Sequence, residues 1–460
     1  MSRDMTKGNI TKHITLFSIP LFIIGICQTL YNFIDAMVVG RFVSANALAS
    51  VGTCASIILF FMVFSNGFGV GFRVITGQLF GSGEHKMTKL SVTTSLIVMA
   101  ALSVVCCALG IIFSRLMLVA LGVPEDLMSD ALLYLQIYFY GLPFIIMYNG
   151  ISNLFYALGD SKIPMLTQII CFVLNIGLEL ALVAVFDMGV AGVAWSGFIT
   201  RGINFLIVLI AIFKKTHKFP KSDKIFDFKI FKKILSVGFP ASIAHSIGAI
   251  NSLVIHRLIN SFDTPIIAGY NIAAKIDSLF MLFINTIASS CGTLVSQNYG
   301  ARDMHRVRRG FKLCMLLNAC YSLLTIVFAR LFGTQLTNLF MNADTDIMLK
   351  DDITSFVTNY ILIISIFYFI YGVGHVANEL LRCVGKIKIT VFSTLIVVLA
   401  RICSAYLLSN YIGPAAIYWS LPISWFSGYV ITITYTFTYK WLPHIKGLRS
   451  NKQKVLAKKV

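Results

Sequence analysis

This sequence contains few charged residues. Only 12% of its 460 residues are Asp, Glu, Lys or Arg, whereas 57% are hydrophobic and the mean hydropathy is +0.82. A soluble domain averages about 25% charged residues, so this composition excludes an ordinary soluble protein. Outer-membrane barrels have short strands of alternating polarity, and the long apolar runs here exclude that class as well. We therefore expect an all-α polytopic membrane protein.

The sequence also lacks the residue spacings of metal, redox and hydrolytic chemistry. Its ten cysteines lie mostly within apolar stretches, and only Cys106 and Cys107 are close together, so neither a zinc site nor a disulfide framework is indicated. A membrane-embedded enzyme is the alternative from another class. That alternative would need a nucleophile–base pair or a metal motif such as His-Glu-x-x-His, and the sequence has none. We expect no enzyme activity and no bound cofactor.

Long apolar stretches recur along the whole chain. A membrane-spanning helix needs roughly 20 apolar residues. Twelve stretches meet this requirement: 14–40, 45–76, 91–115, 131–157, 163–186, 189–213, 234–260, 266–296, 310–332, 354–384, 387–410 and 413–440. Pro and Gly inside several of them predict kinked helices, which neighbouring helices and water can accommodate.

The net charge of +19 is concentrated on one side of the predicted membrane. Of the 38 Lys and Arg residues, 29 lie in the two tails and every second loop, against five in the other loops (Arg41, Arg115, Arg257, Arg330 and Lys350). Positive residues favour the cytoplasmic side, so both termini are predicted to be cytoplasmic. The basic loops are expected to contact anionic lipid headgroups rather than nucleic acid.

The two halves of the chain repeat the same sequence motifs in the same order. Pro20 recurs as Pro240 after 240 − 20 = 220 residues, and Gln78-x-x-Gly81 recurs as Gln297-x-x-Gly300 after 297 − 78 = 219 residues. Each half holds an even number of predicted spans, so the halves share one orientation and form parallel repeats. The predicted parts are a six-helix bundle at 1–213, a basic cytoplasmic linker at 214–233, a second six-helix bundle at 234–440 and a basic cytoplasmic tail at 441–460.

A polar stripe runs along the first predicted helix. Gln28, Tyr31, Asn32 and Asp35 are separated by three, one and three residues, which places all four on roughly one helix face. A charge inside a bilayer costs about 2.5–3.5 kcal/mol on insertion scales, so Asp35 needs a partner, water or a function. We expect this face to line an aqueous cavity. The alternative is an aspartate near the helix end that reaches the external headgroups.

A second polar pair lies on the fifth predicted helix. Asn175 and Glu179 are four residues apart and therefore share a face. If Glu179 lies near Asp35 in a low-dielectric cavity, the two carboxyls disfavour double ionisation and one of them can bind and release a proton. The alternatives are a Glu at the outer interface or one that pairs with a basic group such as Arg201.

Two further polar features predict structural rather than functional roles. His375 and Glu379 are one turn apart in the tenth stretch, and without a third ligand they predict a structural hydrogen-bonded pair rather than a metal site. Arg73 and Arg401 are expected to find partners or to extend towards the headgroups.

Several motifs together resemble the signatures of MATE multidrug transporters. They are Gln28-Thr-Leu-Tyr31-Asn32-Phe-Ile-Asp35, Gln78-Leu-Phe-Gly81, Asn175-x-x-x-Glu179, Gly189-Val-Ala-Gly-Val-Ala-Trp195-Ser196 and Gln297-Asn298-Tyr299-Gly300. The similarity covers nearly the whole chain. Glu179 stands where the family more often has Asp. The stretch 244–251 lacks the mid-helix Glu that one branch of the family has in its seventh helix.

The resemblance implies twelve helices in two bundles that form a V. It implies an antiporter that takes up Na⁺ or H⁺ and exports amphiphilic, often cationic, drugs from a bacterial plasma membrane by alternating access. Asp35, Asn175 and Glu179 are then expected to couple the cation, with Na⁺ as the only metal considered there. Gln28, Tyr31, Asn32 and Ser196 are expected to line the cavity. We expect a monomer with a small-molecule substrate and membrane lipids as partners.

A second transport function is the flipping of a lipid-linked precursor, as in other members of the related superfamily. Such a flippase would favour a more cationic cavity to bind pyrophosphate. The residues at membrane depth in the first half are mainly acidic or neutral, which argues against that alternative.

Overall fold

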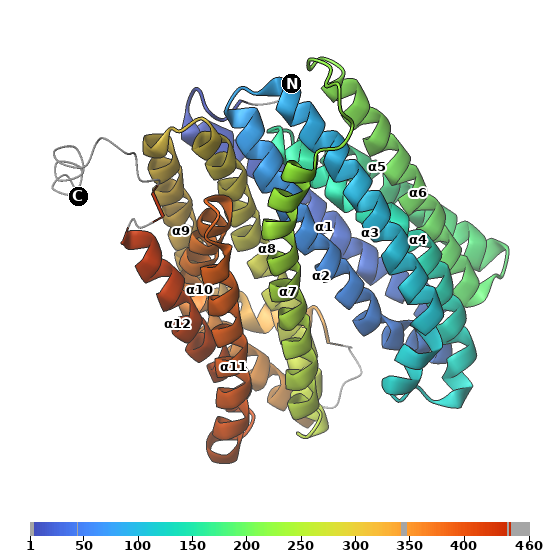
Figure 1. Ribbon diagram of the computed structural model, residues 1–460. Coiled ribbons are helices and arrows are strands. Elements are labelled where there is room, and N and C mark those ends of the chain that lie inside the picture. The colour runs from blue at the N-terminus through green and yellow to red at the C-terminus, as the bar shows by residue number, and fades with distance from the viewer. Residues whose placement is uncertain (1–3, 44, 342–346, 439–440, 443–460) are drawn as a thin grey trace.

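The fold is a set of long helices in a membrane-protein arrangement (Figure 1). The computed structural model describes residues 4–43, 45–341, 347–438 and 441–442, and within these ranges all regular secondary structure is helical. In chain order the helices are α1 (Ile10–Phe42), α2 (Ala45–Gly81), α3 (His85–Ala120), α4 (Glu125–Ala157), α5 (Lys162–Leu180), the π-helix η1 (Ala181–Val185), α6 (Gly189–Thr216), α7 (Phe228–Ile259), α8 (Thr264–Gly300), α9 (Met304–Asn338), α10 (Ile347–Cys383), α11 (Ile387–Ile412) and α12 (Ala415–Phe437).

The predicted all-α fold with twelve long helices is confirmed. Counting only the residues that the structure describes, eleven of them are long and apolar enough to cross a membrane. α12 is not among these eleven, because its 23 residues include several Tyr, Ser and Thr that lower its hydropathy. It nevertheless packs against α10 and α11 inside the same bundle.

The helices form two bundles with the same internal pairing. In α1–α6, helix α4 contacts α2, α3 and α6, while α5 contacts α1 and α6. In α7–α12, helix α10 contacts α8, α9 and α12, while α11 contacts α7 and α12. Each of these contacts of the first bundle therefore has its counterpart six helices later. We call α1–α6 the first bundle and α7–α12 the second bundle.

The repeat extends to how the helices end. α4 ends before Gly159, and α10 ends before Gly385, with φ of +74° and +79° respectively. At these ends the amide of Asp160 donates to the carbonyl of Phe155, and the amide of Lys386 donates to that of Leu381. This is the same glycine-dependent C-terminal motif in both bundles, and a residue with a side chain would be strained in its left-handed backbone.

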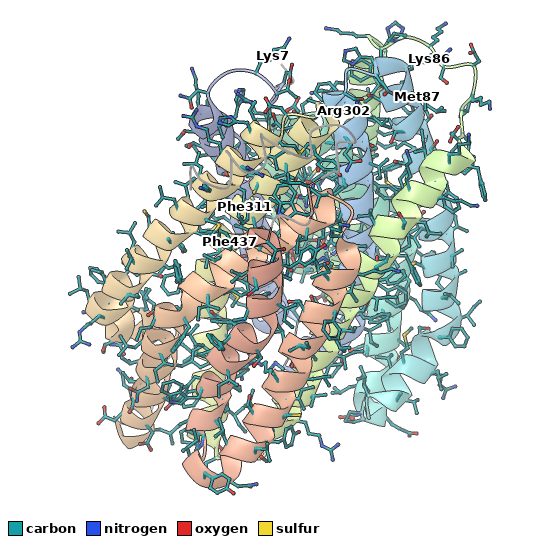
Figure 2. The ribbon with its side chains drawn as sticks, turned by 60° about the vertical axis from the view of Figure 1, so that its left-hand side comes forward. Lys7, Lys86, Met87, Arg302, Phe311 and Phe437 are labelled. Atoms are coloured by element: carbon teal, nitrogen blue, oxygen red, sulfur yellow. The ribbon has the colours of Figure 1, made fainter. Side chains whose placement is uncertain are left out.

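The bundles meet along α2, which contacts α7 and α8, and along α1, which contacts α8. Figure 2 shows Lys7, Lys86 and Arg302 at one end of the molecule, which we call the termini end. One hydrophobic core, which includes Met5 and Trp441, spans both bundles near this end. Two further cores lie one in each bundle and do not join. The bundles are therefore fused at the termini end and separate away from it, as the V shape requires (Figure 1).

Three boundaries differ from those predicted. The non-helical link between the bundles is 217–227, shorter than the predicted 214–233, because α6 and α7 extend beyond their apolar cores. The predicted fifth span ends in η1, a wide turn that apolar patterning does not reveal. Trp441, placed in the tail, is buried and its indole N–H donates to the carbonyl of Thr436 at 2.8 Å. The rest of the predicted tail, 443–460, lies outside the described residues.

Candidate functional site

The polar stripe of α1 faces a buried cluster inside the first bundle. Tyr31 and Asp35 are both partly buried, and Oδ1 of Asp35 is buried with no hydrogen-bond partner in the described part of the chain. Gln28 is exposed, so it lies at the edge of this cluster rather than within it. The side chain of Asn32 lies outside the described residues. The predicted stripe therefore contributes Tyr31 and Asp35 to the cluster.

α5 supplies the second wall of the cluster. Nδ2 of Asn175 lies 3.3 Å from the Tyr31 hydroxyl and 3.4 Å from the Ser196 hydroxyl, and donates to both. Ser196 donates in turn to the carbonyl of Val193 in α6. Asn175 and Ser196 are both buried. This amide thus links α1, α5 and α6, which fixes the spacing of the helices around the cluster.

Glu179 lies one turn beyond Asn175 and is fully buried. Neither of its carboxylate oxygens accepts from an N–H or O–H donor among the residues that the structure describes. Its carboxyl interacts electrostatically with that of Asp35, and the two come close enough for a side-chain hydrogen bond when one of them carries a proton. The structure thus places two carboxyl groups from α1 and α5 side by side in the interior.

One cation accompanies these two acids. The guanidinium of Arg201 in α6 lies 4.5 Å from the ring centroid of Tyr138 and 5.9 Å from that of Tyr31, where the aromatic faces attract it. Arg201 interacts electrostatically with Asp35, but no ion pair within 4.0 Å forms between them in the described chain. The cation is therefore held by rings and is not neutralised by direct contact with a carboxylate.

Gly197 makes room for this stacking. It precedes Arg201 by one turn of α6, and a Cβ atom there would lie 3.1 Å from the Tyr31 hydroxyl and 3.4 Å from Cζ of Arg201. A side chain at this position would require Tyr31 or Arg201 to shift by a few tenths of an ångström. The glycine is thus part of the site through the space that it leaves empty.

The cluster has a definite chemical capacity. With both carboxyls ionised, Asp35, Glu179 and Arg201 carry a net charge of −1. A buried carboxylate without donors is costly, and a proton or a metal cation is what such a group can take up to lower that cost. The cluster can therefore hold one additional monovalent cation. Among the described residues, no three His, Cys, Asp or Glu side chains are placed so that they could hold a metal ion together.

Sequence reasoning missed part of this site. Tyr134 and Tyr138 of α4 are buried and face the same cluster as Asp35 and Arg201. They stand four residues apart in an apolar stretch, which is the only signal that they share a face. Arg201 was considered as a partner of Glu179, but it stacks on tyrosines and interacts with Asp35 instead.

A second buried carboxylate lies between the bundles and is fully paired. Oε2 of Glu379 in α10 accepts from Arg73 of α2 at 2.7 Å, and Oε1 accepts from Arg382 at 2.9 Å. The predicted hydrogen bond between His375 and Glu379 is wrong, because none forms between these described residues and Nδ1 of His375 is buried without a partner there. Arg73 finds a partner, as expected, and the partner belongs to the other bundle.

Comparison with known proteins gives consistent results. The MatE family model matches residues 20–180 and 240–407. A probable multidrug resistance protein, YpnP of Bacillus subtilis, is 29% identical over 387 residues, covering 83% of this chain and 84% of the relative. The multidrug export protein MepA of Staphylococcus saprophyticus is 22% identical over 429 residues, covering 91% of each chain.

The fold also matches solved structures. An outward-facing multidrug resistance MATE family transporter of the MOP superfamily superposes with a TM-score of 0.87, at 20% identity, covering 95% of this chain and 97% of that one. At this identity the likeness shows the shared two-bundle fold and does not assign residue roles.

Proposed function

Since this chain belongs to the MatE family of membrane transporters, we propose that it exports amphiphilic, cationic small molecules in exchange for H⁺ or Na⁺. The relatives named for multidrug resistance and multidrug export support drugs as the substrate class. The single observation that carries the coupling proposal is the buried pair of Asp35 and Glu179, which has no hydrogen-bond partner for three of its oxygens within the described chain.

The orientation is part of the proposal. The termini end carries most of the Lys and Arg residues, so it faces the cytoplasm of a bacterial plasma membrane. The bundles separate away from this end, which supports the proposal that the protein is closed to the cytoplasm in this conformation. The protein acts as a monomer, and its basic loops contact anionic lipid headgroups.

The exchange follows from the charge of the cluster. A drug cation is held in the cavity while Asp35 and Glu179 are ionised. One H⁺ or Na⁺ that enters from outside neutralises the cluster, and the drug then leaves because its electrostatic attraction is lost. The bundles rock to face the cytoplasm, where the coupling cation leaves and a new drug cation binds. Because the cluster has room for one positive charge, one coupling cation exchanges for one monovalent drug cation.

The experiment is efflux of a monovalent fluorescent cation such as ethidium from proteoliposomes. A proton gradient and a sodium gradient are imposed separately, and one of them should drive efflux. A membrane potential alone should not, because a one-for-one exchange moves no net charge. Asp35→Asn should abolish the coupled efflux. Asp277→Asn is the matched control, since Asp277 is a partly buried aspartate of the second bundle whose carboxylate accepts from Tyr368.

Normal efflux by a well-folded Asp35→Asn protein would refute the assignment of this site. The flippase alternative would instead give lipid-precursor movement without drug efflux, and the net negative cluster disfavours a pyrophosphate ligand.

A further inference from the structure

The repeated motif Gln-x-x-Gly brings the two bundles into backbone contact at the termini end. A Cβ atom on Gly81 of α2 would lie 1.9 Å from the carbonyl oxygen of Gln297, and one on Gly300 of α8 would lie 1.9 Å from that of Gln78. The two helices therefore cross with no space for any side chain at either glycine. The crossing is symmetric, because each motif contacts the other.

The glutamines of the same motifs make reciprocal hydrogen bonds across the bundles. Nε2 of Gln78 donates to the carbonyl of Cys383 at 2.7 Å, and Nε2 of Gln297 donates to the carbonyl of Ala157 at 2.8 Å. Cys383 and Ala157 are the last residues of α10 and α4, whose final carbonyls have no partner within their own helix. Each glutamine thus caps a helix of the opposite bundle.

Gln297 and its neighbours make additional hydrogen bonds, with the backbone of Met5. Oε1 of Gln297 accepts from the amide of Met5 at 2.9 Å, and Asn298 and Arg306 both donate to the carbonyl of Met5. The Met5 side chain is fully buried. Residues 4–9 lead into α1, so they tie the first bundle to the turn between α8 and α9. Gln78 has no such second contact among the described residues.

The buried ion pair strengthens the same region. Arg73 reaches from α2 to Glu379 of α10 past Gly292, where a Cβ atom would lie 2.6 Å from Oε2 of Glu379. Gly292 lies five residues before Gln297 on α8. Glycines at the crossing and beside the ion pair therefore allow close approach, and polar groups from both bundles use it.

We propose that Gln78 and Gln297 are positioning residues for the transport cycle, and that they hold the termini end closed until the bundles rock. We call these two glutamines, the crossing glycines Gly81 and Gly300, and residues 4–9 around Met5 the latch. Opening this end requires each glutamine to release a helix of the opposite bundle and Gln297 to release Met5 as well. Gln297 therefore contributes more to closure than Gln78. This role rests on the proposed alternating access, although the closure itself can be measured without transport.

Cys383 is a native reporter of the latch. Its thiol is fully buried against α8 of its own bundle, with Sγ 3.2 Å from the Ser296 hydroxyl and 3.2 Å from the carbonyl of Gly292. Ser296 in turn faces α2 of the other bundle, where a Cβ atom on Gly77 would lie 3.0 Å from Cβ of Ser296, so separation of the bundles uncovers this side of the thiol. The experiment uses a chain in which Cys383 is the only cysteine. Labelling by a hydrophilic maleimide is followed in detergent, with no drug and no ion gradient.

Gln297→Ala should raise the labelling rate more than fivefold, because about fivefold is the population change expected for the loss of one buried hydrogen bond and Gln297 makes two, with Ala157 and Met5. Gln297 does not touch Cys383, so a rise reports separation of the bundles rather than local exposure. Gln78→Ala should also raise the rate, by a smaller factor when local exposure is corrected for. Gln168→Ala is the matched control, because Gln168 accepts from Asn204 within the first bundle. It should leave the rate unchanged.

A parallel chain with Cys171 as its only cysteine separates opening from unfolding. Cys171 is buried in the first bundle, away from the latch. Latch release raises labelling at Cys383 alone, whereas unfolding raises it at both sites. A Cys383 labelling rate in Gln297→Ala equal to that in Gln168→Ala, or an equal rise at Cys171, overturns the proposal. Absence of drug efflux in the parent protein would count against the proposed function and leave this measurement intact.

Discussion

The two buried carboxylates Glu379 and Glu179 differ in whether their oxygens accept hydrogen bonds. Glu379 lies between the bundles, and each of its oxygens accepts from an arginine within 3.0 Å. Glu179 lies inside the first bundle, equally buried, and neither of its oxygens has a partner in the described chain. A satisfied buried charge holds a structure together, whereas an unsatisfied one is available to bind something else. The difference separates a structural carboxylate from a candidate coupling group without reference to position in the sequence.

The strongest test of this contrast is the removal of the satisfied charge. Glu379→Gln should destabilise the protein by about 3–5 kcal/mol, because it leaves Arg73 and Arg382 buried without a counter-ion. Thermal unfolding in detergent, followed by tryptophan fluorescence, measures the loss. The double variant Arg73→Met with Glu379→Leu should recover part of it, since an apolar pair leaves one uncompensated arginine rather than two. Unchanged unfolding of Glu379→Gln would mean that the ion pair does not hold the bundles.

The matching substitution in the first bundle should behave in the opposite way. Glu179→Gln should change the free energy of unfolding by less than about 1 kcal/mol, because the change leaves no N–H or O–H donor of the described chain unpaired. Cation-coupled efflux should nevertheless be lost, because the cluster can no longer exchange a positive charge. Unfolding and efflux are measured on the same preparation. A large loss of stability would place Glu179 with Glu379 as a structural residue.

A milder change tests the space around the unpaired acids. Gly197→Ala should lower efflux several-fold, since the added Cβ crowds the Tyr31 hydroxyl and Arg201. Stability should change little, because alanine is favoured over glycine in a helix by about 1 kcal/mol and this offsets the crowding. Gly177→Ala is the control, as a Cβ there meets no atom within 4 Å. Equal efflux by the two variants would show that Tyr31 and Arg201 need no fixed position.

An exposed carboxylate, Asp223, should contribute least to stability among the carboxylates compared. Lys86 contacts Asp223 at 2.8 Å on the surface, and the hydrogen bond and charge of Lys86 lower the pKa of the Asp223 carboxyl from its ordinary value of 3.8. A lowered pKa in the folded state stabilises the fold at neutral pH, and the effect is lost as the pH falls below about 3.8. Asp223→Asn should therefore lower the unfolding temperature only slightly at pH 7 and low salt. The difference from the parent protein should disappear in high salt, because both groups are exposed.

Much of this architecture could be predicted from the sequence. The repeat offsets and apolar stretches predict twelve helices in two like bundles, since burial in a bilayer leaves few alternatives to helices. Face sharing along α1 and α5 predicts that Tyr31, Asp35, Asn175 and Glu179 point to a common interior. Their proposed roles stay predictions until transport is measured.

Other features could not be predicted, for reasons of range and chemistry. Arg73 and Glu379 are 306 residues apart, and spacing along one helix reveals only local partners. This is why His375 was assigned to Glu379 in place of Arg73. Tyr134 and Tyr138 resemble ordinary packing residues, because an aromatic ring in an apolar stretch does not show that a guanidinium lies on its face. The π-helical turn after Glu179 has no compositional signal at all.

The burial of Met5 has a practical consequence for producing this protein. A purification handle or fluorescent fusion attached ahead of Met1 would be separated by only four residues from the enclosed Met5 side chain, and its bulk would pull on the backbone that Gln297 and Arg306 bind. A handle placed after Val460 avoids this strain. Preparations that differ only in which end is tagged are therefore not interchangeable.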